Sequence, residues 1–436
     1  MTRPTAGVSH GGCVFRAWTV RRVGIGGEVR AYPFFRKSAP AAYFSRKRGV
    51  EAPVPPVVFA LLAFLAIALL LGVSRPLVAQ DTHALVTPGV QHTNALVTPG
   101  VRLEFPRDEG SHPDYRIEWW YVTGWLDSGS KVGAASGGET PPRGFQVTFF
   151  RVRTGIAQDN PSAFAPKQVL FAHAALADPR HGRLHHAQRA AREGFGLAYA
   201  KQGELQVRLD DWSLRQVAPN RYRAVVQGDD FSFDLLLDAT QPPLLQGEDG
   251  FSRKGPDPRA ASYYYSLPQL QASGRIAIGG REHRVRGVAW FDHEWSSRMF
   301  DETARGWDWI GLNLDDGGAL MVQRIRNDAG EQHWGGATLR EPGKTDRSYS
   351  SNEISWTPQR RWRSPRTGVS YPVEWKIALG ERTITLRPLL DDQENDARAS
   401  TGTLYWEGAV RAFDEPCPPN GRGYLELTGY GERLRL

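Results

Sequence analysis

The chain has 436 residues, which is long enough for two or three domains, and its many aromatic residues (11%), glycines (46) and prolines (30) are typical of a β-rich protein with many turns. Its net charge of +7 comes from the N-terminus. Residues 1–80 hold eleven of the 54 basic and two of the 47 acidic side chains, so residues 81–436 are close to neutral. Because acidic and basic residues are interspersed in that part, we expect no nucleic-acid partner.

Residues 1–80 have the order of an export signal. Three basic residues at 46–48 precede an uninterrupted apolar run at 57–73, and small residues follow it. This run of 17 residues is short for a membrane-spanning helix, so a cleaved signal is favoured over a retained inner-membrane anchor. We therefore expect an exported protein, periplasmic or extracellular, with membrane association through residues 57–73 as the alternative.

A linker is predicted at residues 81–103, where ALVTPGV occurs twice, at 84–90 and 95–101. Two copies are too few for a repeat fold, so a duplicated linker is the simpler interpretation. A folded region is expected to begin at residue 104.

From residue 104 onward, short alternating or aromatic runs are separated by Gly, Pro, Asp and Asn, and no amphipathic helix of normal length is found. The pattern predicts strands at 117–126, 144–153, 169–177, 205–209, 222–227, 231–237, 263–266, 274–278, 285–295, 307–314, 319–326, 333–339, 353–357, 373–378, 383–386, 404–410 and 423–427. This number of strands exceeds that of one small barrel but suits two. We predict an all-β fold of barrels or sandwiches, and two tandem barrels at 104–255 and 256–436 suit the number of strands. The Pro- and Gly-rich stretch 242–258 is either the boundary between them or a loop that covers a barrel mouth.

The most informative chemistry lies in the sequence Trp-Phe-Asp-His-Glu-Trp at residues 290–295. Alternation along a strand puts these side chains on two faces: Phe291, His293 and Trp295 on one, and Trp290, Asp292 and Glu294 on the other. An imidazole between two aromatic rings is typical of an apolar pocket with one acid–base group, which makes His293 a candidate catalytic residue. A core histidine in an aromatic-rich strand is an alternative of equal weight.

Further segments that contain aromatic or histidine residues follow one another along the chain: 118–124, 145–151, 173–176, 264–268, 307–309 and 405–410. With these motifs, residues 104–436 resemble the bacterial lipocalin-like proteins related to carotenoid 1,2-hydratase (hydroxyneurosporene synthase), also called AttH-like and described as secreted hydrolases. The resemblance implies two tandem lipocalin-like β-barrel domains with a hydrophobic pocket near their contact. It also implies cofactor-free addition or cyclisation on an apolar substrate such as an isoprenoid or a polyene.

In the hydratases of this family the His and Trp of an Asp-His-x-Trp motif are functional, and the resemblance carries these roles to His293 and Trp295. A Tyr and an Asp from a strand shortly downstream also belong to that site, but the segment that we align with it, residues 318–324, contains neither. The departure favours a non-catalytic carrier of lipid-like ligands at the cell envelope, whereas the intact motif favours a hydratase, isomerase or cyclase.

The remaining candidates are aromatic, acidic or histidine side chains near these motifs. The expected catalytic residues are His293, Trp295 and Asp308, the expected substrate-binding residues are Trp120, Tyr264, Phe291, Trp307 and Trp309, and the expected supporting residues are Glu118, Asp292, Glu294 and His173. Three of them have structural alternatives. Asp308 is a second acid or the partner of an arginine. Glu118 is a carboxyl with a raised pKa or the ion-pair partner of Arg151 or Arg324, and His173 is a second base or a core histidine.

We expect no cofactor and no metal. Neighbours on a strand point to opposite faces, so residues 292–294 do not converge on one ion, and Cys13 and Cys417 fit neither a disulfide nor a zinc site. His185 and His186 lie in a basic segment predicted to be a surface loop. Hydrolase activity is the least favoured function, because no Gly-x-Ser-x-Gly elbow and no HExxH motif is present. The expected partner is a hydrophobic small molecule, and the sequence sets no oligomeric state.

Overall fold

The computed structural model of the protein describes residues 94–128, 141–156, 158–414 and 419–434. The predicted export segment at 1–80 and the first copy of the linker repeat lie outside these residues. The described residues form an all-β structure, and its helices are the single 3-10 turns Arg107–Glu109 and Ser351–Glu353. None of the described helices is long and apolar enough to cross a membrane.

The first sheet is antiparallel and follows the order β4-β3-β2-β1-β13-β12-β9-β8-β7-β6-β5, with the short strands β10 and β11 paired with β12. Its strands are β1 (Ile117–Ser128), β2 (Arg143–Arg153), β3 (Gln168–Ala177), β4 (Leu184–Arg192), β5 (Ala198–Ala200), β6 (Gln206–Leu209), β7 (Trp212–Ala218), β8 (Arg221–Gln227), β9 (Phe231–Asp238), β10 (Leu244–Leu245), β11 (Phe251–Arg253), β12 (Ala261–Ile278) and β13 (Arg281–Arg298). Contacts of β6 with β3 and β4 bring the two ends of this sheet together, which closes it into a barrel.

The second sheet is also antiparallel, in the order β17-β16-β15-β14-β23-β22-β20-β19-β18, with β21 paired with β22. Its strands are β14 (Gly306–Leu314), β15 (Ala319–Arg326), β16 (Gln332–Arg340), β17 (Arg347–Ser350), β18 (Ile354–Arg363), β19 (Ser370–Leu379), β20 (Arg382–Pro388), β21 (Glu394–Ala397), β22 (Thr403–Phe413) and β23 (Pro419–Thr428). Contacts between β16 and β18 close this sheet in the same way. The predicted fold class, all-β with two lipocalin-like barrels, is confirmed.

The division between the barrels differs from the predicted one. The boundary expected at 255/256 falls inside the first sheet, because β12 and β13 pair with β9 and β1. The Pro- and Gly-rich stretch 242–258 forms β10, β11 and their loops, which lie against β12. The chain passes from one sheet to the other at residues 299–305.

One predicted loop is a strand. His185 and His186 belong to β4, and the His185 side chain is buried with its Nδ1 2.7 Å from Asp230 Oδ2. The segment was read as a surface loop because of its many basic residues. However, β4 pairs with β3 along its whole length, and that pairing outweighs the polar composition.

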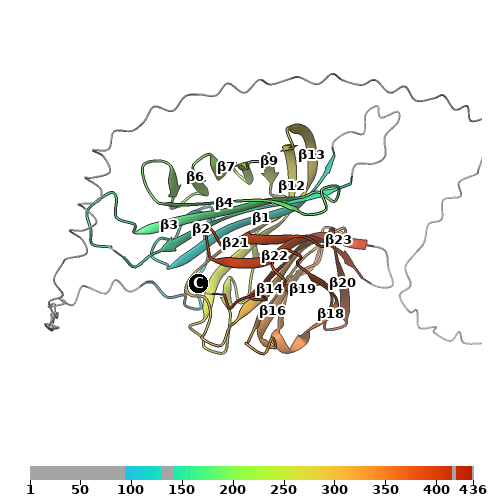
Figure 1. Cartoon of the computed structure of the whole chain (residues 1–436). Coiled ribbons are helices and arrows are strands. Elements are labelled where there is room, and N and C mark those ends of the chain that lie inside the picture. The colour runs from blue at the N-terminus through green and yellow to red at the C-terminus, as the bar shows by residue number, and fades with distance from the viewer. Residues whose placement is uncertain (1–93, 129–140, 157, 415–418, 435–436) are drawn as a thin grey trace, which may run out of the picture. The chain divides into compact units, whose positions relative to one another are not determined.

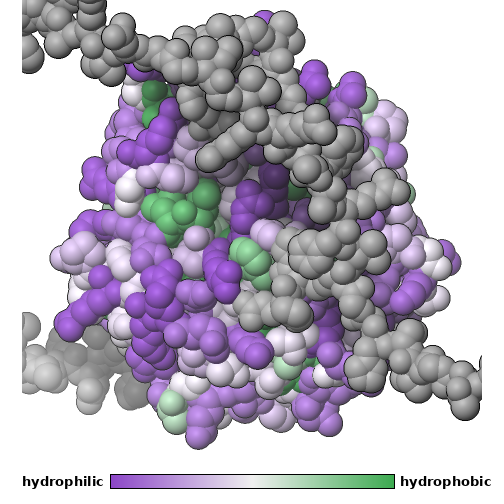
Figure 2. Space-filling model, turned by 90° about the vertical axis from the view of Figure 1, so that its right-hand side faces the viewer, coloured by the Kyte–Doolittle hydropathy of each residue, from purple (hydrophilic) through white to green (hydrophobic). Residues whose placement is uncertain are grey.

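Apolar side chains form three main clusters and a small fourth one at Ala175, Ala177 and Leu184. One cluster fills each barrel, and a third joins them across their contact: Tyr121, Trp125, Leu244, Tyr264, Trp290, Trp309, Ala319, Met321, Ala409 and Tyr424. Figure 1 shows the two sheets as separate layers, and the face in Figure 2 is mostly hydrophilic, with small hydrophobic patches. The contact between the barrels is therefore a buried aromatic layer.

Candidate functional site

The two faces of β13 belong to different compartments. β1 and β13 pair in a register that sets Trp120 opposite His293 and Tyr121 opposite Asp292. Side chains alternate along both strands as the sequence pattern predicts. His293 and its odd-numbered neighbours point into the first barrel, whereas Asp292 and Glu294 point towards the second barrel.

His293 lies in the core of the first barrel, with no exposed surface. Its Nε2 is 3.0 Å from Oε1 of Glu118, and its Nδ1 is 3.1 Å from the backbone carbonyl oxygen of Asp108. The Trp120 ring stacks on it with centroids 4.8 Å apart. Burial lowers the pKa of His293 to about 4, so the imidazole is neutral at pH 7.

Glu118 is the centre of this group. Arg151 donates from Nε to Oε2 of Glu118 at 2.8 Å, so the ion pair that was one of the two alternatives for Glu118 is present. Phe291 packs in the same core, and Trp295 stacks on the ring of His112 with centroids 3.8 Å apart. Phe291 and Trp295, like Trp120 and His293, therefore lie inside the first barrel.

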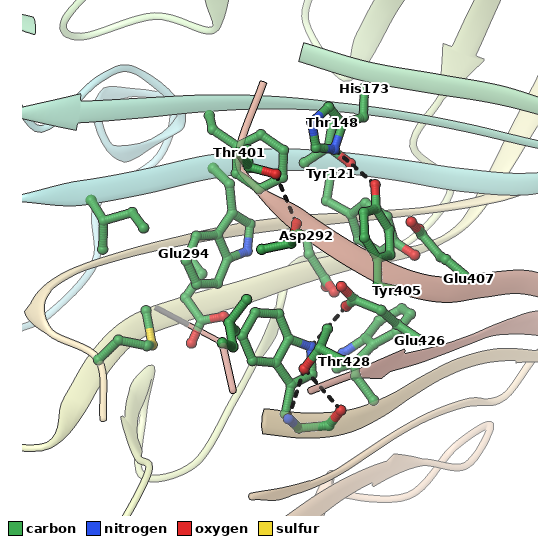
Figure 3. A pocket seen from close by; sticks show the side chains of 18 of the residues that line it. Tyr121, Thr148, His173, Asp292, Glu294, Thr401, Tyr405, Glu407, Glu426 and Thr428 are labelled. Atoms are coloured by element: carbon green, nitrogen blue, oxygen red, sulfur yellow. Dashed lines mark hydrogen bonds between the residues drawn. The ribbon is translucent and has the colours of Figure 1, made fainter. Parts of the chain in front are cut away.

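A cavity of about 330 Å³ lies on the other face of β1 and β13, between the barrels. Its wall is largely aromatic and aliphatic: Ile117, Trp119, Tyr121, Phe150, Val152, Phe171, Met299, Phe300, Trp307, Trp309, Ile325 and Leu434. Figure 3 shows the polar side chains that project into it from both sheets. Of the sequence-predicted site residues, the structure brings six to this cavity: His173, Tyr264, Asp292, Glu294, Trp307 and Trp309.

Asp292 is held by three hydrogen-bond donors. Ser266 and Trp290 donate to Oδ1 at 2.5 and 2.7 Å, and the hydroxyl of Tyr264 donates to Oδ2 at 2.8 Å. Tyr264 in turn accepts a hydrogen bond from Trp309 Nε1 at 2.8 Å. Burial raises the pKa of Asp292 to about 7 although the three donors oppose the shift, so this carboxyl changes its charge near neutral pH.

Two further polar groups of the cavity have partners of their own. Glu294 forms an ion pair with Lys254, Nζ to Oε1 at 2.7 Å. His173 lies 2.8 Å through Nδ1 from the hydroxyl of Tyr405 and 2.9 Å through Nε2 from that of Ser400. Burial lowers the pKa of His173 to about 3, so it is a neutral histidine with both nitrogens hydrogen-bonded.

Sequence reasoning missed a pair of glutamates in the second barrel. Glu407 on β22 and Glu426 on β23 are register partners, and both line the cavity together with Asp292 (Figure 3). Burial, and then repulsion from Glu426, raise the pKa of Glu407 well above its ordinary value. Burial also raises the pKa of Glu426 to about 7, with repulsion from Asp292 adding to the shift. The available signal was a lone glutamate between apolar residues in each predicted strand.

Asp308 occupies the interior of the second barrel, on the opposite face of β14 from the cavity residues Trp307 and Trp309. It has no exposed surface and accepts from Arg324 Nε at 2.6 Å and from Arg326 Nε at 3.1 Å. The arginine partner, one of the two alternatives for Asp308, is therefore present.

We predict that Glu426→Gln weakens the pH dependence of stability. Because the pKa of Glu426 is raised in the folded state, folding retains a proton that the unfolded chain loses, and stability falls as pH rises from about 4.5 to about 7. The variant should therefore be more stable than the wild type at pH 8, by about 1–3 kcal/mol, and similar to it near pH 4. Urea unfolding at both pH values measures this, with the exposed Glu282→Gln as control. An unchanged pH dependence would contradict the assignment.

Known proteins identify the family. The AttH-like family matches residues 96–430. The crystal structure of a protein from Nitrosomonas europaea assigned to AttH is 46% identical, covers 77% of this chain and 99% of its own, and has a TM-score of 0.70. Kievitone hydratase from Nectria haematococca shares the fold at 15% identity, with 78% and 97% covered and a TM-score of 0.57. No curated protein matches the chain. From the extent of the family match, the chain belongs to the AttH-like family.

Proposed function

We propose that the cavity between the barrels binds a hydrophobic small molecule and catalyses cofactor-free hydration, isomerisation or cyclisation of it. The observation that carries the proposal is the presence of three carboxyls, the buried Asp292 and Glu407 and the partly buried Glu426, in a cavity whose wall is largely aromatic and aliphatic. Carboxyls whose pKa values are raised to neutrality or above are suited to proton transfer at physiological pH. The fold shared with a hydratase supports the same class of chemistry as an analogy.

The three carboxyls suit different steps. Burial raises the pKa of Glu407 well above its ordinary value, which favours its protonated form, so it is suited to donate a proton to one carbon of a double bond. Water then adds to the carbocation, or a neighbouring carbon loses a proton, and Asp292 accepts the proton that is released. Glu426 interacts electrostatically with both groups and is placed to return that proton from Asp292 to Glu407, which restores the starting state.

The indole rings of Trp307 and Trp309 contribute to the same chemistry. Both line the cavity, and both have their N–H groups engaged, with Glu426 and Tyr264 respectively. Aromatic rings stabilise a nearby positive charge by about 0.5–2 kcal/mol, and by more where water is excluded. They therefore suit a substrate that passes through a carbocation.

The proposed proton acceptor is Asp292, the neighbour of His293 in the chain. His293, Trp295 and Asp308, the expected catalytic residues, do not line the cavity. We propose that His293 and Trp295 instead fix the strand that presents Asp292. Because the motif histidine lies outside the cavity, a carrier of hydrophobic ligands is the second candidate function. In either case the signal-like order of residues 1–80 supports export.

One experiment separates the two functions. The full chain is purified from the exported fraction, and native mass spectrometry with solvent extraction identifies any bound hydrophobic molecule. That molecule is then incubated with the protein in D2O. An enzyme of the proposed class forms carbon–deuterium bonds or adds D2O, and both raise the mass of the recovered molecule. A carrier returns the molecule unchanged, and that outcome would remove the enzyme proposal.

A further inference from the structure

A second group of ionisable side chains lies on the inner face of β1 and β13, away from the cavity. Nδ1 of His112, Oε1 of Glu118 and Nε2 of His293 all lie within 4.8 Å of one another. His112 comes from the segment before β1, Glu118 from β1 and His293 from β13. Two imidazoles and one carboxylate are a common ligand set for divalent transition metals.

The outer contacts of these ligands orient them towards one point. Nε2 of His112 is 3.4 Å from Oδ1 of Asp108, and Nδ1 of His293 is 3.1 Å from the backbone oxygen of Asp108. Arg151 occupies the other oxygen of Glu118, Oε2. Metal-binding histidines usually donate their second N–H to a carboxylate or a carbonyl in this manner, which turns the lone pair of the first nitrogen to the metal.

More than one pattern of protons fits the contacts of His293. A neutral imidazole with its N–H on Nε2 donates to Oε1 of Glu118 at 3.0 Å and accepts at Nδ1 from the hydroxyl of Tyr265 at 3.3 Å. The backbone carbonyl oxygen of Asp108, 3.1 Å from the same Nδ1, then receives no proton from His293. A cation bound at Nε2 places the N–H on Nδ1, which then donates to that carbonyl oxygen.

We infer that His112, Glu118 and His293 form a binding site for a divalent transition metal of the Zn²⁺ type. Bonds of about 2.0–2.2 Å in tetrahedral geometry separate ligand atoms by about 3.3 Å. Nδ1 of His112 and Nε2 of His293 lie 2.7 and 3.0 Å from Oε1 of Glu118, so each nitrogen needs to move away from that oxygen by only a few tenths of an ångström, and the two nitrogens lie within 4.8 Å of each other. The His112 side chain is 17% exposed, which provides an entry path and a place for a water ligand.

The metal would tie the segment before β1 to the wall of the barrel. Trp119 and Asp292, which neighbour Glu118 and His293 in the chain, project from the same two strands into the cavity. The site therefore has a structural role, and it does not depend on what the cavity binds.

The test is a titration of the full chain with ZnCl2 and CoCl2 after chelator treatment. We expect one ion per chain by calorimetry, a Tm raised by several degrees, and a visible Co²⁺ spectrum. His112→Gln should lower affinity by about 100-fold or more and abolish the spectrum. His185→Gln is the control, since His185 is also a largely buried histidine paired with an aspartate but belongs to no such three-residue group among the described residues, and it should bind as the wild type does.

Absence of stoichiometric binding to the wild type would overturn the inference without any variant. Equal affinity in His112→Gln, or an equal loss in His185→Gln, would also overturn it, because the ion would then bind elsewhere. Circular dichroism of both variants checks that they fold. Substrate turnover is not used as a readout, so failure of the proposed function leaves this result unaffected.

Discussion

Replacing Asp292 with asparagine is expected to reduce turnover by about 10²- to 10⁴-fold, the usual contribution of a positioned acid or base. The amide keeps the shape of the carboxyl and accepts through one oxygen, so the donors Ser266, Trp290 and Tyr264 retain part of their hydrogen bonding. What is lost is the acceptor for a proton. Single-turnover kinetics on the molecule identified by mass spectrometry would measure the loss, and calorimetry would show ligand affinity within tenfold of the wild type.

Thr401→Val is the control for this experiment, because Thr401 lines the same cavity and has no titratable group. Its turnover should remain within a few-fold of the wild type. If Asp292→Asn turned over as fast as this control, the proton acceptor would have to be another group. If the affinity of Asp292→Asn collapsed, Asp292 would be a binding residue.

Replacing Asp308 with asparagine is expected to lower the free energy of unfolding by about 3–5 kcal/mol. Asp308 has no exposed surface and neutralises both Arg324 and Arg326, so its loss leaves two buried or nearly buried guanidinium groups without their carboxylate. The sequence alone made Asp308 a candidate acid. Its position inside the second barrel predicts a loss of stability with normal turnover per folded molecule, as urea unfolding and active-site titration would show.

Asp328→Asn is a matched control. Asp328 also contacts two arginines, Arg305 and Arg433, but its side chain is 64% exposed. Surface ion pairs of this kind contribute about 0–1 kcal/mol, so the control should unfold almost as the wild type does. A similar small effect for Asp308→Asn would contradict the structural role.

The fold was predictable because its signals are local. Alternation of apolar side chains marked most strands, and the same alternation separated Phe291 and His293 from Asp292 and Glu294. Such inferences need only the rule that successive side chains of a strand point to opposite faces, and this rule can be applied to the sequence alone.

The location of the cavity was not predictable in this way. Alternation says which residues share a face, but it does not say which face meets the second barrel. That choice depends on the docking of β1, β2 and β13 against β23, β22 and β14 respectively, a contact between distant parts of the chain. For the same reason the lone glutamates Glu407 and Glu426 could not be assigned to a site, because they meet Asp292 only after the barrels have docked.

The expected absence of a metal stays a prediction, and the argument for it has the same limit. It was argued from neighbours along one strand, where side chains do diverge. His112 lies 181 positions before His293 and outside the strands, and it approaches His293 only because the segment before β1 packs against the barrel. A ligand set assembled from three separate segments has no spacing that a single sequence displays.

The wall formed by β1 and β13 also constrains how this gene can change. Because a single layer of strands separates the interior of the first barrel from the cavity, consecutive residues at 290–295 face opposite sides of that layer. Inserting or deleting one codon there would turn His293 towards the cavity and Asp292 into the barrel, since a shift of one residue reverses every face of a strand. Point substitutions disturb one compartment at a time, whereas a single-codon length change disturbs both. We therefore expect insertions and deletions in this segment to be tolerated less often than substitutions.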